Sequence, residues 1–375
     1  MLSRGDDFPI HQTPNPIAYP DSDRNFYDRY FFNAYAPDGS AMLGVAFGVY
    51  PNVNVADAHV AVQIDGRAHC LHASRVLNME RLDLRVGPIA LEVREPLQRL
   101  ALRVDDSHGI AGEIVWEGRA FPIEEPRFTR RNGPRLVMDF TRLTQNCRVS
   151  GWLSVDGRRI ELQGWLGTRD RSWGIRNIGT PDPQPMVPPR SGHMFWQWAP
   201  LNFEDRSVFF HVMADETGAP WNLRSVVVRD GAGAAEHLEC EDAHAEVTLA
   251  PGTRHPASAR LSIHPKGSPE LQIEMAPRLR FPMRAIGYLS SSWPHGGFKG
   301  ELAVEREEIV DIDPRDPTFL HTQTVVLCTL RQDGQTPQRG IGVFEQLIRG
   351  PYVPLGLSGL LDPQAAAGAA LQETP

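Results

Sequence analysis

The sequence predicts an all-β protein built from two antiparallel β lobes. Apolar residues alternate with polar ones over many short segments, which is the pattern of half-buried strands. Asp-Gly and proline-containing turns separate these segments, and helical periodicity is nearly absent from the first half of the chain. Because 375 residues exceed one typical domain, we expect two lobes. Such short strands favour an antiparallel sandwich or barrel over a parallel sheet with crossover helices.

The first lobe is expected to span residues 26–180, after an irregular arm of residues 1–25 that is rich in Pro, Asp and Asn. A hairpin comes first, because an aromatic run and an apolar run flank the turn Pro37-Asp38-Gly39. Further strands are predicted at residues 60–64, 82–86, 89–93, 100–104, 114–116, 136–140, 149–155 and 160–166.

The second lobe is expected to span residues 181–360, followed by a frayed, alanine-rich tail at 361–375. It begins with residues 181–189, which hold five prolines and are interpreted as a stiff loop, either a lid or a plain connection. Its strands are predicted at residues 195–200, 208–213, 223–228, 246–249, 259–263, 271–275 and 325–330.

Charge and composition exclude several classes of partner and cofactor. The net charge is −8 and no basic block occurs, which argues against a nucleic-acid surface or an anionic membrane as partner. No apolar run is long enough to span a bilayer and no signal peptide is evident, so we expect a cytoplasmic protein. The four cysteines form no C-x-x-C, and His69 and His72 have no further ligand at suitable spacing. No metal or cofactor is therefore predicted.

Two neighbouring stretches, residues 164–176 and 193–198, hold an unusual density of chemical groups. Within 35 positions they gather one carboxylate, three arginines, one histidine and four of the eight tryptophans. One interpretation is a pocket in which Asp170 or His193 handles a proton while aromatic faces hold an apolar substrate or a developing positive charge. The other is a packed junction in which Asp170 pairs with Arg169, Arg171 or Arg176.

The neighbouring arginines decide the role of Asp170. If they point away, Asp170 can be an acid that a dry site keeps protonated; if they point inward, it is a base or a structural anchor. Trp196 and Trp198 are two residues apart and share one face of a strand, which suits a barrel interior as well as an ordinary core.

A second cluster spans residues 293–301, where glycines allow close backbone approach and His295, Lys299 and Glu301 supply proton-transfer groups. A solvent-exposed hairpin is the structural alternative. The predicted catalytic residues of the whole chain are Asp170, His193, His211 and His295. The predicted substrate-binding residues are Trp173, Arg176, Trp196, Trp198, Tyr288, Lys299, Glu301, His321 and Glu345.

Several of these segments resemble the lipocalin-like proteins grouped with carotenoid 1,2-hydratase (hydroxyneurosporene synthase). The likeness extends thinly over residues 27–350. It rests on the Asp-Arg-x-Trp-Gly signature within 164–174, Trp196-Gln197-Trp198 with residues 203–206 and 208–211, and the closing glycine-glutamate strand at 340–345.

This resemblance implies two lipocalin-like β-barrel lobes with a ligand cavity in or between them. Relatives include hydratases of isoprenoid double bonds, a fungal hydratase of a prenylated isoflavonoid and fungal Diels-Alderases, all without an organic cofactor or metal. Thr168 departs from the pattern, since this position is often aromatic in the carotenoid hydratases. That difference argues against a carotenoid substrate.

We therefore expect a cofactor-free lyase of the hydratase type, or an isomerase or cyclase, that acts on an apolar isoprenoid, steroid-like or aromatic molecule. The alternative is a lipocalin-type carrier that binds a hydrophobic ligand without chemistry. A weaker third hypothesis is Schiff-base chemistry at Lys299. The expected partner is a hydrophobic small molecule, and a homodimer is the assembly considered.

Overall fold

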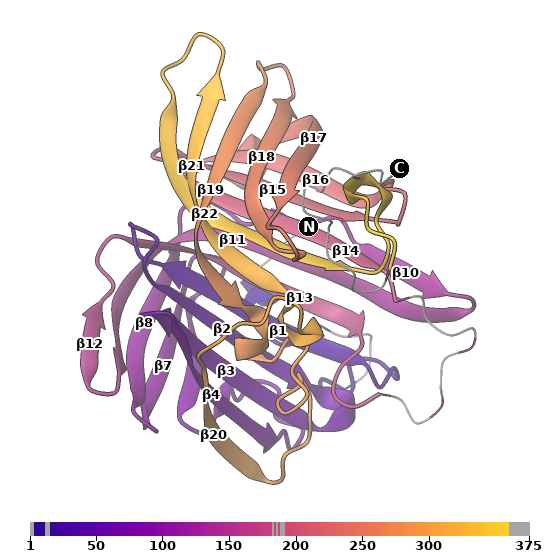
Figure 1. Ribbon diagram of the computed structural model, residues 1–375. Coiled ribbons are helices and arrows are strands. Elements are labelled where there is room, and N and C mark those ends of the chain that lie inside the picture. The colour runs from indigo at the N-terminus through magenta and orange to yellow at the C-terminus, as the bar shows by residue number, and fades with distance from the viewer. Residues whose placement is uncertain (1–3, 12–15, 182–183, 185–186, 188–191, 360–375) are drawn as a thin grey trace, which may run out of the picture.

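Two antiparallel β-sheets contain most of the chain, and they pack against each other (Figure 1). The computed structural model describes residues 4–11, 16–181, 184, 187 and 192–359. The predicted all-β class with two antiparallel lobes is confirmed. The tail expected at 361–375 and most of the proline-rich segment 181–189 lie outside the described residues.

The first sheet, sheet A, has fourteen strands. Its hydrogen-bonded order is β20 (Leu302–Ile309), β4 (Arg67–Val76), β3 (Val55–Ile64), β2 (Met42–Tyr50), β1 (Phe26–Tyr35), β13 (Trp165–Arg176), β11 (Arg135–Val155), β8 (Ile110–Gly118), β7 (Arg99–Ser107), β6 (Ile89–Glu95) and β5 (Arg85–Val86). Three short strands also pair with β11, namely β9 (Ile123–Glu124), β10 (Phe128–Asn132) and β12 (Arg158–Glu161). The sheet curls until its ends approach, since Arg75 Nε of β4 donates to the Arg85 carbonyl of β5 at 2.7 Å.

The second sheet closes into an eight-stranded barrel. Around it run β14 (Met194–Asn202), β15 (Arg206–Ala214), β16 (Pro220–Arg229), β17 (Leu238–Leu249), β18 (Pro256–Pro265), β19 (Leu271–Pro282), β21 (Thr322–Gln332) and β22 (Gln338–Arg349). Strand β20 lies between β19 and β21 in the sequence but belongs to sheet A. The second half of the chain thus completes the first sheet.

The helices of the described residues are six 3-10 turns of three or four residues. None of them is long and apolar enough to cross a membrane. They are η1 (Arg4–Asp7), η2 (Pro51–Val53), η3 (Ala234–Glu236), η4 (Met283–Ile286), η5 (Pro317–Phe319) and η6 (Val353–Leu355).

Three apolar layers explain why buried and exposed residues alternate along some strands, whereas other strands are buried along their whole length. One core fills sheet A, a second fills the barrel, and a third lies between the two sheets. In β1, Tyr30 and Phe32 face the core of sheet A whereas Phe31 and Tyr35 face the layer between the sheets. The whole aromatic run is therefore buried. Outer strands such as β8 instead alternate buried and more exposed residues.

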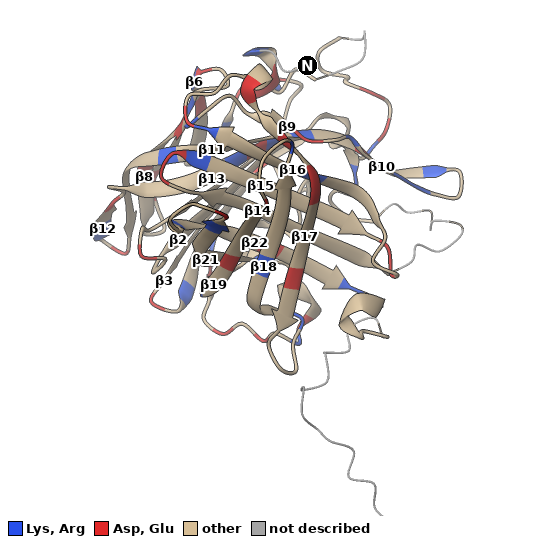
Figure 2. Ribbon diagram, turned by 90° about the horizontal axis from the view of Figure 1, so that it is seen from above, with Lys and Arg blue, Asp and Glu red and all other residues tan. Residues whose placement is uncertain are grey.

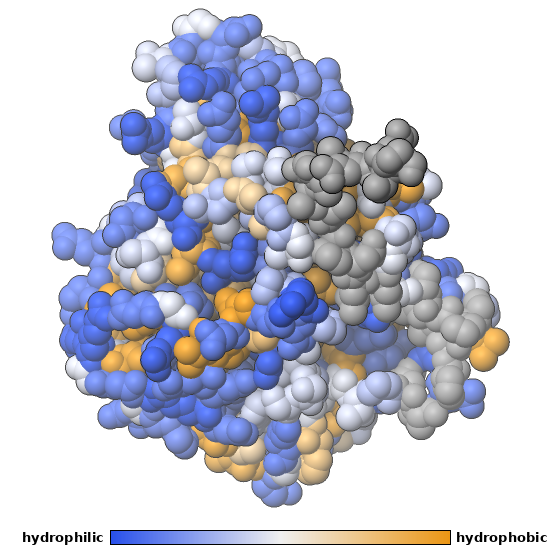
Figure 3. Space-filling model, viewed as in Figure 1, coloured by the Kyte–Doolittle hydropathy of each residue, from blue (hydrophilic) through white to orange (hydrophobic). Residues whose placement is uncertain are grey.

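Charged residues of both signs occur on the two sheets. Acidic and basic residues are interspersed along both sheets (Figure 2). On the face in Figure 3, hydrophilic residues predominate, and apolar residues gather where the upper and lower lobes meet. This distribution draws attention to the junction between the lobes.

Buried ion pairs fix the N-terminal arm to sheet A. Arg169 Nη1 donates to Asp7 Oδ1 of η1 at 2.5 Å, and both side chains are buried. Asp28 of β1 pairs with Arg171 and, at 3.3 Å, with Arg81, and all three are inaccessible to solvent. A buried charge that loses its partner is strongly destabilising, so the Asp7–Arg169 pair holds the arm in place. Arg81 adds to this by donating to the carbonyls of Ile17 and His11.

The Asp28→Asn variant leaves two buried guanidinium groups without their counter-charge. We expect it to lose about 3–5 kcal/mol of unfolding free energy, measured by urea denaturation. The matched control is Asp65→Asn, which breaks an exposed pair with Arg158 and is expected to cost at most about 1 kcal/mol. Equal losses in the two variants would contradict this account.

Candidate active site

A cavity of about 660 Å³ lies between the two sheets. Strands β1, β11 and β13 of sheet A form one wall, the outer face of barrel strands β14 and β22 forms the opposite wall, and segment 283–295 closes a side. Its volume falls within the range of about 300–1,000 Å³ typical of small-molecule sites. Much of the lining is apolar or aromatic, contributed by Phe31, Phe128, Met138, Phe140, Trp196, Met213, Met283 and Leu347.

Asp170 projects from β13 into this cavity. It lies between Phe31 of β1 and Thr144 of β11 in the register of the sheet. Arg29 and Arg142 are diagonal neighbours on these two strands and share its face. Arg142 Nη1 is 3.9 Å from Asp170 Oδ2, and none of the hydrogen bonds among the described residues ends on this carboxyl group.

Burial raises the pKa of Asp170 to about 7, because the surrounding walls shield its carboxylate from water. Arg142 and Arg29 lower this pKa, while the negative charges of Glu125 and Glu345 add to the rise. Near neutral pH both the protonated and the ionised forms of Asp170 are therefore populated. This is the range in which a carboxyl group is an effective proton donor and acceptor.

The three arginines that neighbour Asp170 in the sequence do not pair with it. Arg169 and Arg171 point to the opposite face of β13, where they bind Asp7 and Asp28. The guanidinium group of Arg176 lies 5.1 Å from the ring centre of Tyr27. The hypothesis that these arginines anchor Asp170 is wrong. The two-residue period of a strand places Arg169 and Arg171 on the other face, whereas Arg176 shares the face of Asp170 but lies over the Tyr27 ring.

A second acid, Glu345 of β22, lines the opposite wall together with His321. Glu345 accepts hydrogen bonds from His321 Nε2 at 2.7 Å, Gln323 Nε2 at 2.6 Å and Trp196 Nε1 at 2.7 Å. Burial alone would raise the pKa of Glu345, but these partners lower it below the usual range. The three hydrogen bonds leave one of about four lone-pair positions of the carboxylate open.

Glu125 is a third buried acid, and it is paired. Arg142 Nε donates to Glu125 Oε2 at 2.8 Å, and Thr144 Oγ1 donates to Oε1 at 2.7 Å. His211 Nδ1 lies 3.6 Å from the same carboxylate, and Trp198 Nε1 donates to it at 3.3 Å. The positive charge of Arg142 is thus balanced mainly by Glu125. It therefore balances only weakly the negative charge that Asp170 carries when it is ionised.

Tyr288 forms a polar and aromatic corner of the cavity. Its ring stands edge-on to His295, 4.7 Å away, and to His321, 5.0 Å away, while Arg29 lies 4.9 Å from the ring centre. His193 also lines the cavity, and burial lowers its pKa below the usual value for histidine. Of the predicted site residues, the cavity brings together Asp170, Arg176, His193, Trp196, Tyr288, His295, His321 and Glu345.

A family model described as a family of unknown function (DUF8625) matches residues 2–358. The chain belongs to the DUF8625 family. A comparison with curated proteins found no match for this DUF8625 chain.

Solved structures with a similar fold include two proteins at low sequence identity. One, provisionally named AttH, comes from Nitrosomonas europaea and is 14% identical, with a TM-score of 0.48 over 85% of this chain and 92% of that chain. The other is kievitone hydratase from Nectria haematococca, which is 10% identical, with a TM-score of 0.44 over 91% of this chain and 98% of that chain. Neither match says anything about the substrate of the DUF8625 chain.

Five predicted site residues do not line the cavity of this DUF8625 protein. Trp173 lies on the opposite face of β13 and stacks on His11 of the arm at 3.6 Å. Trp198 and His211 lie behind the wall and contact Glu125. Two more residues, Lys299 and Glu301, belong to an exposed part of the segment that precedes β20.

The tryptophans of β14 help to decide between the two expected locations of the cavity, which were inside a lobe and between the lobes. Trp196 and Trp198 do share one face, but it is the outer face of the barrel. The barrel interior is filled by the alternate residues, among them Ala199 and Leu201. The cavity consequently lies between the lobes and not inside the barrel.

Sequence reasoning missed three charged residues of the site, Arg29, Arg142 and Glu125. They come from separate parts of sheet A and surround Asp170 only through long-range strand pairing. A local signal existed for Arg29 alone, because a charged pair interrupts the aromatic run of β1.

The raised pKa of Asp170 has a measurable effect on stability. The folded protein retains a proton that the unfolded chain releases above its ordinary pKa of 3.8, so Asp170 lowers stability progressively as the pH rises from about 4 to about 7. We expect wild type to lose stability relative to Asp170→Asn across this window, measured by urea denaturation at a series of pH values.

The control for this titration is Asp139→Asn on neighbouring β11. Its hydrogen bond from Arg127 lowers the pKa of Asp139, so its contribution is complete above pH 3.8 and is lost only under more acidic conditions. The difference in unfolding free energy between wild type and Asp139→Asn is expected to stay constant from about pH 4 to about pH 7. If the difference in unfolding free energy between wild type and Asp170→Asn also stayed constant with pH, the raised pKa of Asp170 would be refuted.

Proposed function

We propose that this protein is a lyase of the hydratase type, acting on an apolar isoprenoid, steroid-like or aromatic small molecule. The observation that supports this most is Asp170, a buried carboxyl group with a pKa near 7 that faces a cavity lined in part by aromatic side chains. Across the cavity, Glu345 is held in the ionised form by His321 and its other partners. Addition of water to a double bond needs such an acid and such a base.

The first step is proton transfer from Asp170 to one carbon of the double bond. The π electron pair forms the new C–H bond, the neighbouring carbon becomes cationic, and Asp170 becomes a carboxylate. Trp196 and Tyr288 line the cavity, and an aromatic face stabilises such a cation. Arg142 and Arg29 already lie over one face of these rings, at 4.8 and 4.9 Å from the ring centres, so the opposite faces have this role. Arg29 and Arg142 stabilise the carboxylate that remains, because both lower the pKa of Asp170.

The second step is attack of water on the cationic carbon. The water forms the C–O bond and gives up one proton to the pair of Glu345 and His321, which lies on the wall opposite Asp170. Exchange with solvent then restores the proton on Asp170. The reverse sequence is a dehydration, and the first step without capture by water gives an isomerase or cyclase.

The charged residues of the cavity favour a substrate with a hydrogen-bond acceptor at one end. Among the described lining residues, only Asp170 and Glu345 are carboxylic acids. Five arginines accompany them, namely Arg29, Arg135, Arg142, Arg176 and Arg349. A phenolic, keto or carboxylate group on an otherwise apolar body is complementary to this lining.

The reaction is tested with a panel of prenylated phenols, isoprenoids and steroids in deuterated, ¹⁸O-labelled water, analysed by mass spectrometry. A hydratase places one deuterium on carbon and one ¹⁸O in the product. We expect Asp170→Asn to slow this about 10²–10⁴-fold, because general acid catalysis contributes that much. The Asp139→Asn variant is expected to retain the wild-type rate, since Asp139 pairs with Arg127 outside the cavity.

Other labelling patterns separate the alternatives. Deuterium without ¹⁸O would replace the hydratase by an isomerase or cyclase at the same acid. Tight binding that is lost in Trp196→Ala, without labelled product from any compound, would support the carrier hypothesis. Labelled product formed at the wild-type rate by Asp170→Asn would remove Asp170 from the mechanism.

A further inference from the structure

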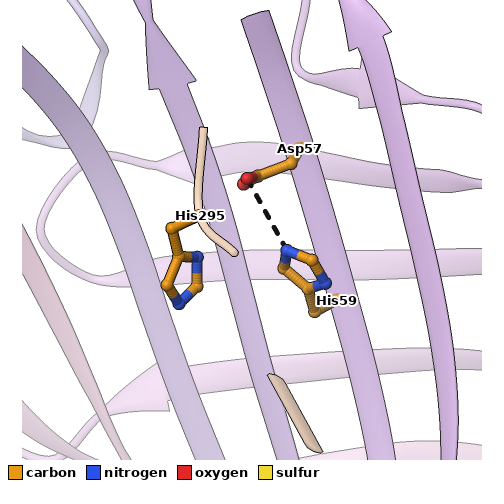
Figure 4. Close-up of side chains that lie close together, drawn as sticks. All are labelled: Asp57, His59 and His295. Atoms are coloured by element: carbon orange, nitrogen blue, oxygen red, sulfur yellow. Dashed lines mark ion pairs between the residues drawn. The ribbon is translucent and has the colours of Figure 1, made fainter. Parts of the chain in front are cut away.

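A group of buried histidines lies at the cavity wall, where only His295 lines the cavity itself, and none of them takes part in the proposed reaction. Asp57 and His59 are alternate residues of β3, His72 of β4 pairs with His59, and His295 reaches them from the segment before β20. The exposed fractions of Asp57, His59 and His72 are 1% or less, and that of His295 is 8%. Figure 4 shows Asp57, His59 and His295 converging on one point.

Hydrogen bonds orient the ring of His59. Its Nδ1 lies 2.9 Å from His72 Nδ1, and a single proton serves both nitrogens. His72 Nε2 lies 3.4 Å from the carboxylate of Glu307, which favours a proton on that nitrogen and leaves His72 Nδ1 as the acceptor. His59 then donates from Nδ1, and its Nε2 carries a lone pair.

That lone pair points at another acceptor. His59 Nε2 lies 3.6 Å from Asp57 Oδ2 and has no hydrogen-bond partner among the described residues. Both oxygens of Asp57 are held in place, because Oδ2 itself accepts from Gly296 N–H at 2.6 Å and Oδ1 accepts from the Tyr50 hydroxyl at 3.1 Å. A lone pair and a carboxylate at this distance repel each other unless a cation or proton lies between them.

His295 provides an independent indication. Both of its ring nitrogens are buried without a hydrogen-bond partner in the described structure. Leaving such groups unpaired is costly, so native proteins rarely do it. One ligand atom from each of Asp57, His59 and His295 lies within 4.8 Å of the other two. A proton on His59 would satisfy Asp57 but would leave His295 unpaired.

We propose that Asp57, His59 and His295 bind one divalent transition-metal ion of the zinc class. Two imidazoles and a carboxylate suit zinc and its neighbours, whereas magnesium and calcium prefer oxygen ligands. For two of the three ligands, flanking residues have the arrangement common around such ions, in which hydrogen bonds orient the ligand. Here His72 orients His59, and Tyr50 with Gly296 orients Asp57.

The ion ties the segment between η4 and β20 to sheet A. This segment carries Tyr288 and His295, which both line the cavity. Gly296 allows its backbone to approach β3, since it has φ +74° and a side chain there would meet the ring of Tyr50. Ser74 Oγ also donates to the Gly297 carbonyl at 3.2 Å. The site is therefore structural: none of its three ligands acts in the proposed reaction, but the segment that it holds carries Tyr288 of the cavity.

A second group of possible ligands offers a control. His69, Asp156 and Glu308 also lie close together, but they are more exposed. Arg306 already occupies their centre, since it donates to Asp156 and Glu308 and contacts His69 Nδ1 at 3.1 Å. Any ion that binds there is expected to be weak and adventitious.

The test uses the full chain without an affinity tag, stripped with a chelator, incubated with zinc and passed through gel filtration. Mass spectrometry of the metal content is expected to find one zinc per wild-type chain. Asp57→Asn and His295→Gln are expected to retain less than about a tenth of it, because loss of even an orienting partner costs about 10–100-fold in metal affinity. His69→Gln and Asp170→Asn are expected to retain zinc fully.

X-ray absorption of the wild-type zinc form checks the ligands without any variant, and circular dichroism checks that each variant is folded. Scattering from two imidazoles supports the site. Wild-type protein that retains no zinc, a spectrum without imidazole, or loss of zinc in His69→Gln would overturn it. The Asp170→Asn variant changes the proposed catalytic acid and none of the proposed zinc ligands. If this variant loses hydratase activity but retains zinc, the inferred zinc site stands.

Discussion

Strand β13 is covered on both faces, and the two-residue period of its side chains decides what each face contains. On one face Arg169 and Arg171 are matched by carboxylates of β1 and the N-terminal arm. On the other face Asp170 meets a layer from which water is largely excluded, and no residue of its own strand compensates its charge. Its unusual protonation therefore follows from the covering of β13.

The candidate site needs both sheets. Sheet A supplies Asp170 and the arginines beside it, while the barrel supplies Glu345 and its partners. Of the two carboxylic acids that line the cavity, sheet A thus supplies one and the barrel the other. The separation of the two carboxyl groups is set by the aromatic layer between the sheets, which includes Phe31 and Trp198 in edge-to-face contact at 6.2 Å. Packing in this layer thus sets the geometry of the chemistry.

The sequence predicted the architecture better than the site. Alternation and turn residues identified an all-β chain, and the density of groups at 164–176 identified Asp170. The same density led to the wrong prediction that Trp173 binds the substrate. Trp173 and Asp170 are three residues apart in one strand, so their side chains point to opposite faces. Periodicity showed that Trp196 and Trp198 share a face, but it could not show which buried layer that face meets. Two apolar layers look alike in a sequence.

The charged residues around Asp170 could not be predicted from the sequence for a different reason. Arg142 and Glu125 reach it through pairing between strands far apart in the chain, and no local pattern encodes that register. The buried histidine group has the same origin, since His295 is remote in sequence from Asp57 and His59. Lys299 and Glu301 show the converse, because they lie next to His295 in the chain yet face solvent.

The position of β20 has a consequence for the synthesis and the ancestry of this chain. The outer edge of β4 has no partner until β20 has left the ribosome, by which time most of the barrel sequence has been translated. An open strand edge is a template for pairing with other chains, so nascent copies on one messenger RNA are exposed to mispairing during this interval. A single recombination point between the lobes would also leave sheet A incomplete, so the two halves are inherited together.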